Sequence, residues 1–261
     1  MERVAAILIA GLLLVTAQPR TDGNSQIAHQ QLVNKARRGG IDIYFEGDSI
    51  TRRWGTSDAP YRDMLENWRR NFFGWNAANF GWGGDTVQNI LWRVTNGELD
   101  DVLPKVIVLL AGTNNIGPAP RAGVPGINDV TVDEVAGGIQ AIVGVMRQKA
   151  PGAVIVLTGV TPRADSDGSS TLMPTIDAIN RRIAALANGV TVRYININAR
   201  LADAGGALRP GMTEDGLHLS VEGYQVWADA LTPIFTELLG PRAATDHAPP
   251  PTGDPSAQNP K

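Results

Sequence analysis

The chain contains no cysteine and only three histidines among its 261 residues. The absence of cysteine excludes disulfides, thiolate metal sites and a cysteine nucleophile, and it is compatible with export. The formal net charge is only -3, and no run of basic residues is present, which argues against nucleic acid as a partner. Histidine most often serves as the general base near neutral pH, so its scarcity leaves few candidates for that role.

Residues 1–17 have the layout of a secretory signal peptide. An apolar run over residues 4–16 follows a short segment that carries Arg3, and residues 15–17 suit cleavage by signal peptidase. The run is too short for a clear transmembrane helix. We therefore expect a secreted or periplasmic protein without stable membrane insertion after cleavage. The alternative is an N-terminal anchor that stays attached.

Composition divides the remaining chain at about Gly240. Residues 18–240 have the length of one α/β domain and show no internal repeat. Beyond Leu239, prolines accumulate and large apolar side chains are almost absent. Such a segment buries too little apolar surface to fold by itself. We therefore expect residues 241–261 to form a disordered, dispensable tail, or a linker to another domain.

Short apolar runs alternate with helical patterns between these two ends. The runs predict strands at residues 41–45, 106–111, 154–158 and 192–197, with a weaker one at 75–80. The intervening patterns predict helices at about residues 61–73, 86–95, 132–149, 173–188 and 221–239. This alternation predicts a single three-layer α/β/α domain with a five-stranded parallel sheet. Ligands of such sheets bind at the carboxyl ends of the strands.

A possible nucleophile follows the first expected strand. Gly47, Asp48 and Ser49 lead into a helix, so the Ser49 hydroxyl and backbone N–H can both face the crevice at a helix N-terminus. A serine that merely caps the helix explains this tripeptide equally well. We expect Asp48 to support the loop rather than to react.

Two more loops carry groups that could bind an oxyanion. The glycine-rich loop at residues 80–86 lets the backbone pass close to a ligand and present an N–H, although a simple glycine turn has the same sequence. Residues 111–115 end in Asn114 and Asn115, and a side-chain amide at a strand end is a donor that cannot be titrated away. A turn-forming role is expected for one of the two asparagines.

The last loop supplies the candidate base. His218 lies three residues after Asp215, a spacing that lets the carboxylate reach Nδ1 while Nε2 faces a serine. His29 precedes the first strand, and His247 lies in the proline-rich segment. By elimination, His218 is the base if the chain has one.

These loops, in this order, resemble the SGNH or GDSL-like esterase and lipase superfamily. The family is named for a serine, a glycine, an asparagine and a histidine, which here are Ser49, Gly84, Asn114 and His218. The resemblance covers about residues 42–238, and the stretch 79–115 is most similar to catalytic subunits of intracellular platelet-activating factor acetylhydrolase.

The resemblance implies a flavodoxin-like SGNH hydrolase fold and a serine esterase that needs neither metal nor organic cofactor. It also implies a triad and an oxyanion hole. The triad would be Ser49, His218 and Asp215, and the oxyanion would be held by the N–H groups of Ser49 and Gly84 and by the Asn114 amide.

The substrate is less constrained than the chemistry. Trp82 stands where the acetylhydrolases have an aliphatic residue, so their lipid substrate is not carried over. Exported bacterial members often deacetylate sugars, which implies a secreted carbohydrate O-acetyl esterase acting on a small acyl ester or acetylated carbohydrate. Trp54 and Trp82 are candidates for an aromatic wall against a sugar ring, with a place in the core as the alternative. Arg163 could reach the crevice, whereas Arg52 and Arg53 fit a solvated helix face better than an anion site.

Two other functions remain open. A lysophospholipase or thioesterase acting on lipids would need a long apolar channel for its acyl chain. An inactive fold relative could instead serve as a carbohydrate-binding or scaffold module, tethered by the C-terminal segment. A complete set of catalytic side chains argues against the second alternative, because a binding module has no use for a base beside a serine.

Overall fold

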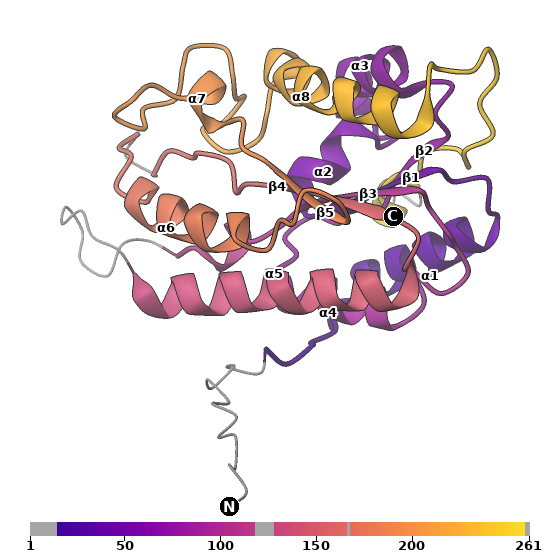
Figure 1. The fold of residues 1–261 in the computed structure, drawn as a ribbon, viewed down its shortest axis with the longest axis horizontal. Helices are drawn as coiled ribbons and strands as arrows, with labels where there is room; N and C mark the ends of the chain where they lie inside the picture. Colours follow the sequence, from indigo (N-terminus) through magenta and orange to yellow (C-terminus); the bar gives the residue numbers. More distant parts are fainter. Residues whose placement is uncertain (1–14, 118–127, 166–167, 259–261) are drawn as a thin grey trace, which may run out of the picture.

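The computed structural model describes residues 15–117, 128–165 and 168–258. Its strands are β1 (Ile43–Gly47), β2 (Ala77–Asn79), β3 (Val106–Leu110), β4 (Val154–Thr158) and β5 (Val192–Ile195). They form one parallel sheet in the order β2-β1-β3-β4-β5, with helices on both faces (Figure 1). The expected three-layer domain is confirmed, and the strand order is that of flavodoxin-like folds.

The helices of the described residues agree with most of those predicted. They are α1 (Gly23–Arg37), α2 (Ser49–Trp54), α3 (Arg62–Phe72), α4 (Val87–Thr95), α5 (Asp129–Lys149), α6 (Met173–Ala184), α7 (Asn198–Leu201), α8 (Val221–Leu239) and α9 (Pro255–Gln258), with 3-10 turns η1 (Ala59–Tyr61) and η2 (Thr113–Asn115). Helix α1 is not among the predicted helices. Asp22 caps its first turn, and its buried residues are Ser25, Ala28, Leu32, Val33, Lys35 and Ala36. Because only Leu32 and Val33 among them are large apolar side chains, the apolar pattern is weak.

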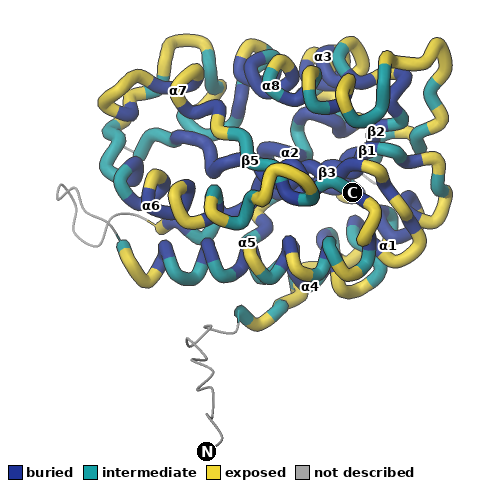
Figure 2. Tube along the Cα trace, viewed as in Figure 1, coloured by how far each residue is buried: buried dark blue, intermediate teal, exposed yellow. Residues whose placement is uncertain are grey.

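Different helices cover the two faces of the sheet. Helices α1, α4, α5 and α6 lie on one face, and α2, α3, α7 and α8 lie on the other (Figure 1). Tyr44 packs with the first set of helices, whereas its neighbours Ile43 and Phe45 pack with the second. Strands β1, β2 and β3 are buried along their whole length between these layers, whereas β5 at the edge of the sheet is only half-buried (Figure 2).

The parallel register determines which loops meet. Gly47 at the end of β1 pairs with Leu110 at the end of β3, so the loops that follow these strands leave the same edge of the sheet. Phe80, just after β2, donates its N–H to the Phe45 carbonyl of β1 at 2.8 Å. The candidate nucleophile, glycine loop and asparagine turn are therefore brought together by the strand pairing.

The C-terminal segment packs against the domain, so the expected disordered tail over residues 241–261 is wrong for its described part. This part lies on the β2 side of the sheet (Figure 1). The Ala243 N–H donates to the Gly74 carbonyl at 2.9 Å, and the His247 N–H donates to Asn76 Oδ1 at 2.7 Å. Residues 259–261 lie outside the described residues.

Thr252 fastens the segment further along. Its carbonyl accepts the Thr56 hydroxyl at 3.1 Å, and its hydroxyl accepts the buried Lys35 ammonium at 3.0 Å. Burial lowers the pKa of Lys35 to about 7. Most of these contacts are polar or use the backbone, and prolines reduce the entropy that the segment loses on ordering. A composition argument that counts only apolar surface does not detect such anchoring.

The expected signal peptide falls almost entirely outside the described residues. Only residues 15–17 are described, and Val15 and Ala17 pack against the core while the Gln18 N–H donates to the Gln88 carbonyl at 3.0 Å. Cleavage at this position stays a prediction. In the three described ranges, no helix combines the length and apolar character that crossing a membrane requires.

Deletion of residues 241–261 should lower the melting temperature by several degrees. The deletion removes hydrogen bonds to Gly74, Asn76 and Thr56, each contributing about 1 kcal/mol, and it exposes Lys35. A total loss of about 3 kcal/mol corresponds to roughly 6–12 °C for a domain of this size. Circular dichroism melts test this, with deletion of residues 259–261 as the control. An unchanged melting temperature in the longer deletion would mean that the segment does not stabilise the domain.

Candidate active site

Ser49 is the first residue of α2, directly after β1. Gly47 is required there because a Cβ would lie 2.2 Å from Thr51 Oγ1 and 2.4 Å from the Leu110 carbonyl oxygen. Asp48 is buried and caps the helix, with Oδ1 accepting the Ile50 N–H at 2.9 Å. The helix cap is therefore Asp48, which leaves the Ser49 hydroxyl available for other contacts.

Ser49, His218 and Asp215 form a continuous chain of hydrogen-bonding atoms. His218 Nε2 lies 2.9 Å from Ser49 Oγ, and His218 Nδ1 lies 2.7 Å from Asp215 Oδ2. The second carboxylate oxygen, Asp215 Oδ1, accepts the N–H groups of Leu217 at 3.1 Å and His218 at 2.8 Å. The structure thus brings together the three side chains that the sequence singles out, in the predicted order of contact.

The electrostatics around these three side chains favour an ionised Asp215 and a neutral His218. Partial burial raises the pKa of Asp215, but hydrogen bonds from His218 and Leu217 outweigh it and lower this pKa to about 2. Burial lowers the pKa of His218, the bond to Asp215 opposes this effect, and the positive charge of Arg53 adds to it. At neutral pH the imidazole is therefore mainly uncharged and able to accept a proton at Nε2.

The two asparagines of η2 have different surroundings. Asn115 Oδ1 accepts the Val87 N–H at 2.9 Å, and its Nδ2 donates to Gln88 Oε1 at 2.8 Å, so this amide holds the start of α4. Asn114 Nδ2 donates one hydrogen to the Asp85 carbonyl at 2.9 Å. The second Nδ2 hydrogen of Asn114 can therefore donate to another acceptor. Asn114 is thus the better candidate for an oxyanion donor, and it is fixed against the glycine loop beside Gly84.

Gly84 is exposed at the tip of its loop and has a φ of 77°. A side chain would be strained in this left-handed conformation, and its Cβ would lie 3.1 Å from an Arg20 guanidinium nitrogen. Arg20 also donates to the Gly83 carbonyl at 3.1 Å. The loop can therefore present the Gly84 N–H outward, as an oxyanion site requires.

A buried arginine that sequence reasoning missed connects these loops. All five N–H donors of Arg93 on α4 are used within the protein. Its Nε donates to Asp85 at 2.6 Å, and its terminal nitrogens donate to Glu46 at 2.6 Å and to Glu98. They also donate to the carbonyls of Phe80 at 2.8 Å and Gly47 at 3.1 Å. Arg93 therefore joins the loops after β1 and β2 behind the site.

Three buried carboxylates surround this single guanidinium. Burial raises the pKa of Glu46 to about 8, against the attraction of Arg93, and burial raises the pKa of Asp85 to about 6. Glu98 Oε1 also lies 2.7 Å from His29 Nδ1, so His29 belongs to this buried network and is not a partner of Ser49. A sequence signal does exist: Glu46 interrupts an apolar strand, and Arg93 lies one turn after buried Ile90.

Both tryptophans proposed as an aromatic wall are buried, so that expectation is wrong. Trp54 is fully buried, stacks on Tyr224 and Trp227 at 4.9 and 5.1 Å, and donates its Nε1–H to Asn67. Trp54 lies five residues after Ser49 on α2. At 3.6 residues per turn, this spacing points the Trp54 side chain away from the direction of Ser49 and towards the core.

Trp82 is 7% exposed because α1, the helix that the sequence did not predict, covers it. Its Nε1–H donates to Ser25 Oγ of α1 at 2.8 Å, and its ring faces the Arg52 guanidinium at 4.8 Å. Protein groups therefore contact the ring at its edge and on one face, and little of it is left for a substrate.

The predicted arginines also have protein partners. Arg163 is half-buried and donates to the Thr113 carbonyl at 3.0 Å, beside Asn114, while burial lowers its pKa. A substrate contact by Arg163 stays a prediction. Arg52 and Arg53 are only 13% and 19% exposed and pair with carboxylates, so the solvated helix face expected for them is wrong.

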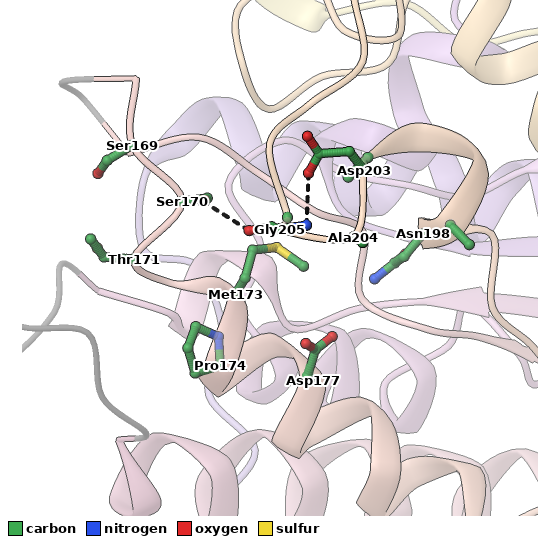
Figure 3. Close-up of a pocket in the computed structure, with 13 residues that line it drawn as sticks. Ser169, Ser170, Thr171, Met173, Pro174, Asp177, Asn198, Asp203, Ala204 and Gly205 are labelled. Atoms are coloured by element: carbon green, nitrogen blue, oxygen red, sulfur yellow. Dashed lines mark hydrogen bonds between the residues drawn. The ribbon is translucent and has the colours of Figure 1, made fainter.

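A separate cavity of about 580 Å³ opens between α6 and α7 (Figure 3). Asp177 and Met173 of α6 line it, with Asn198 of α7 and the turn that contains Asp203 on the other side. Ser49, His218 and Asp215 are not among the residues that line this cavity. It is therefore distinct from the candidate active site.

Arg93→Met should destabilise the protein by about 3–5 kcal/mol, because it leaves three buried carboxyl groups without their cation. Urea unfolding at neutral pH measures the loss. Arg37→Met is the matched control, since Arg37 forms an exposed pair with Asp101 that contributes less than about 1 kcal/mol. Equal stability of the two variants would show that the buried network contributes nothing specific.

Comparison with known proteins is consistent with this geometry. The model of the GDSL-like Lipase/Acylhydrolase family matches residues 45–226. Platelet-activating factor acetylhydrolase IB subunit alpha2 of Rattus norvegicus is 32% identical over 212 residues, which cover 81% of this chain and 83% of the relative. Subunit alpha1 of Bos taurus is 30% identical over 223 residues, covering 84% and 85%.

Solved structures support the same fold. A GDSL-like lipase from Bacteroides thetaiotaomicron aligns with a TM-score of 0.59 and 21% identity, covering 83% of this chain and 98% of the other. A lipase/acylhydrolase from Enterococcus faecalis aligns with a TM-score of 0.55 and 20% identity, covering 78% and 100%. The family match spans most of the domain, including Ser49 and His218. The chain therefore belongs to the GDSL-like lipase/acylhydrolase family and is a hydrolase that acts on esters.

Proposed function

We propose that this protein hydrolyses esters of short acyl groups, acetyl foremost, through Ser49, His218 and Asp215. The observation that carries the proposal is the unbroken contact from Ser49 Oγ to His218 at 2.9 Å and from His218 to Asp215 at 2.7 Å. A neutral imidazole held between a hydroxyl and an ionised carboxylate is the arrangement that activates a serine.

In the first half of the reaction, Ser49 Oγ attacks the ester carbonyl carbon while His218 Nε2 takes the hydroxyl proton. Asp215 holds the proton on Nδ1 and stabilises the imidazolium. The imidazolium then gives its proton to the departing alcohol oxygen, which leaves an acyl group on Ser49. In the second half, water loses a proton to His218, attacks the acyl carbon and releases the acid together with free Ser49.

The tetrahedral intermediates place a negative charge on the former carbonyl oxygen. We assign its stabilisation to the N–H groups of Ser49 and Gly84 and to the second Nδ2 hydrogen of Asn114. The φ of Gly84 and the bond from Asn114 to the Asp85 carbonyl support this assignment, because both fix donors at the edge of the sheet where Ser49 lies.

The alcohol part of the substrate distinguishes two candidates. A secreted carbohydrate O-acetyl esterase remains our proposal on the basis of the apolar segment at residues 4–16, which suits export, although buried Trp54 and Trp82 no longer support a sugar platform. A second candidate, a lipid that carries an acetyl group in place of the long acyl chain of a lysophospholipase substrate, is favoured by 32% identity to a protein named platelet-activating factor acetylhydrolase. Both candidates share the acetyl group, so the acyl side of the proposal does not depend on the choice.

A scaffold or binding module without activity is the least favoured function. A module of that kind has no need for a histidine that contacts both a serine and a carboxylate, nor for a loop cross-linked by Arg93. Turnover that depends on Ser49 would exclude it.

Turnover of p-nitrophenyl esters should fall steeply from acetate to long acyl chains, and Ser49→Ala should reduce turnover of the acetate about 10³-fold or more. Acetylated xylan and platelet-activating factor, assayed in parallel, separate the carbohydrate and lipid candidates. Addition of EDTA should change nothing, because side chains and backbone N–H groups of the protein fill every catalytic role in the proposed mechanism.

A preference for long acyl chains would contradict the acetyl proposal. Ser49→Ala protein that is folded and keeps more than about a tenth of the activity would contradict the serine mechanism itself.

Asn114→Ala should lower kcat by roughly 10²–10³ with little change in KM, the usual cost of one oxyanion donor. Asn115→Ala is the matched control. Its amide holds α4, so it should lower the melting temperature more than kcat. A larger kcat loss in the Asn115 variant would exchange the roles assigned to the two asparagines.

A further inference from the structure

The helix that presents the nucleophile also presents a cation to the triad acid. Arg53 lies four residues after Ser49 on α2, a spacing that places both side chains on the same side of the helix. A terminal nitrogen of Arg53 lies 3.4 Å from Asp215 Oδ2. This is the same oxygen that lies 2.7 Å from His218 Nδ1. Arg53 and His218 therefore share one carboxylate oxygen.

Arg53 is held in this position by groups on two other segments. Its guanidinium lies 5.0 Å from the centre of the Tyr61 ring in η1 and 3.9 Å from Glu214 Oε2 in the catalytic loop. Its side chain is 19% exposed. An arginine fixed on a ring face loses less freedom when it binds a carboxylate than a free surface arginine does.

We propose that Arg53 is a positioning residue that ties the acid to the nucleophile's helix and extends the activity of the esterase into more acidic solution. The inference rests on the proposed function, because it assumes that His218 acts as the base for Ser49. It assigns to Arg53 no contact with the substrate and no proton transfer.

The charges around His218 determine the direction of the effect. Asp215 and Glu214, on its own loop, favour the protonated imidazole, whereas Arg53 on α2 disfavours it. The Tyr61 ring also faces Arg53, the Ser49 hydroxyl faces His218, and the buried Tyr224 hydroxyl donates to the Ile50 carbonyl of α2. Removing the Arg53 charge should therefore raise the pKa of His218 and move the acidic limb of the pH–rate profile to higher pH. Removing the Glu214 charge should move this limb to lower pH.

The first experiment compares kcat/KM for p-nitrophenyl acetate in wild type and four variants between about pH 5 and pH 9. In Arg53→Gln, activity at the acidic end relative to the alkaline plateau should fall about three- to tenfold, the effect of one partly screened charge at this range. Arg53→Lys should keep the wild-type limb, and Glu214→Gln should shift it in the opposite direction.

Arg52→Gln is the matched control. Arg52 precedes Arg53 on the same helix but pairs with Asp58 and Asp254 instead of the triad acid. Its removal should leave the limb in the wild-type position. Melting temperatures of all variants identify any that do not fold, and the Glu214 variant tests the same electrostatic balance with Arg53 intact.

The second experiment measures the titration of the His218 ring by NMR, independently of turnover. The chain has only three histidines, so a His218→Asn spectrum identifies the signal. The His218 titration should move to higher pH in Arg53→Gln and stay unchanged in Arg52→Gln.

Unchanged titration and an unchanged limb in Arg53→Gln would overturn the inference. Absence of Ser49-dependent turnover in wild type would instead overturn the proposed function, and the NMR titration would still report the effect of Arg53.

Discussion

The geometry of the site depends on the buried guanidinium of Arg93. Strand pairing brings the loops after β1, β2 and β3 to one edge, but it does not fix their distances from one another. Arg93 does so by binding the carbonyls of Gly47 and Phe80 and the side chain of Asp85. The Asp85 carbonyl in turn holds the Asn114 amide. One arginine therefore sets the relative positions of the serine turn, the glycine loop and the asparagine turn. This arrangement requires the burial of three carboxyl groups. Burial raises the pKa of one of them, Glu46, to about 8.

The two sides of the site are consequently built in different ways. The proposed oxyanion side rests on the buried ionisable groups around Arg93, whose positions are determined by the fold. The proposed acid-base side is more open at Asp215, whose side chain is 46% exposed, whereas the His218 side chain is only 12% exposed. Here the short helix α2 supplies both Ser49 and Arg53, so the contact of Arg53 with Asp215 links the loop of Asp215 and His218 to Ser49, the proposed nucleophile. A change of charge at Arg53 should therefore alter the pKa of His218 without disturbing the buried network around Arg93.

The sequence predicts the sheet and the meeting of Ser49, His218 and Asp215, because local strand patterns and the carboxyl-edge rule both depend on short segments. The sequence does not predict the features that depend on contacts between distant segments. Trp54 and Trp82 are buried by α8 and α1, and helix α1 has an apolar stripe too weak to recognise. The C-terminal segment is held by polar bonds to distant turns, which composition does not reveal. Arg93 carries a local signal, a charge on an apolar helix face, but its five partners come from three separate segments.

The most direct test of the account is to trap the acyl-enzyme. Protein mixed with p-nitrophenyl acetate and quenched in acid within the first turnovers is digested, and its peptides are weighed by mass spectrometry. The account predicts one acetyl group on the peptide that contains Ser49, and none on that peptide after Ser49→Ala substitution. Hydrolysis that proceeds with no acetyl group on Ser49, or with the group on another residue, would contradict the proposed mechanism.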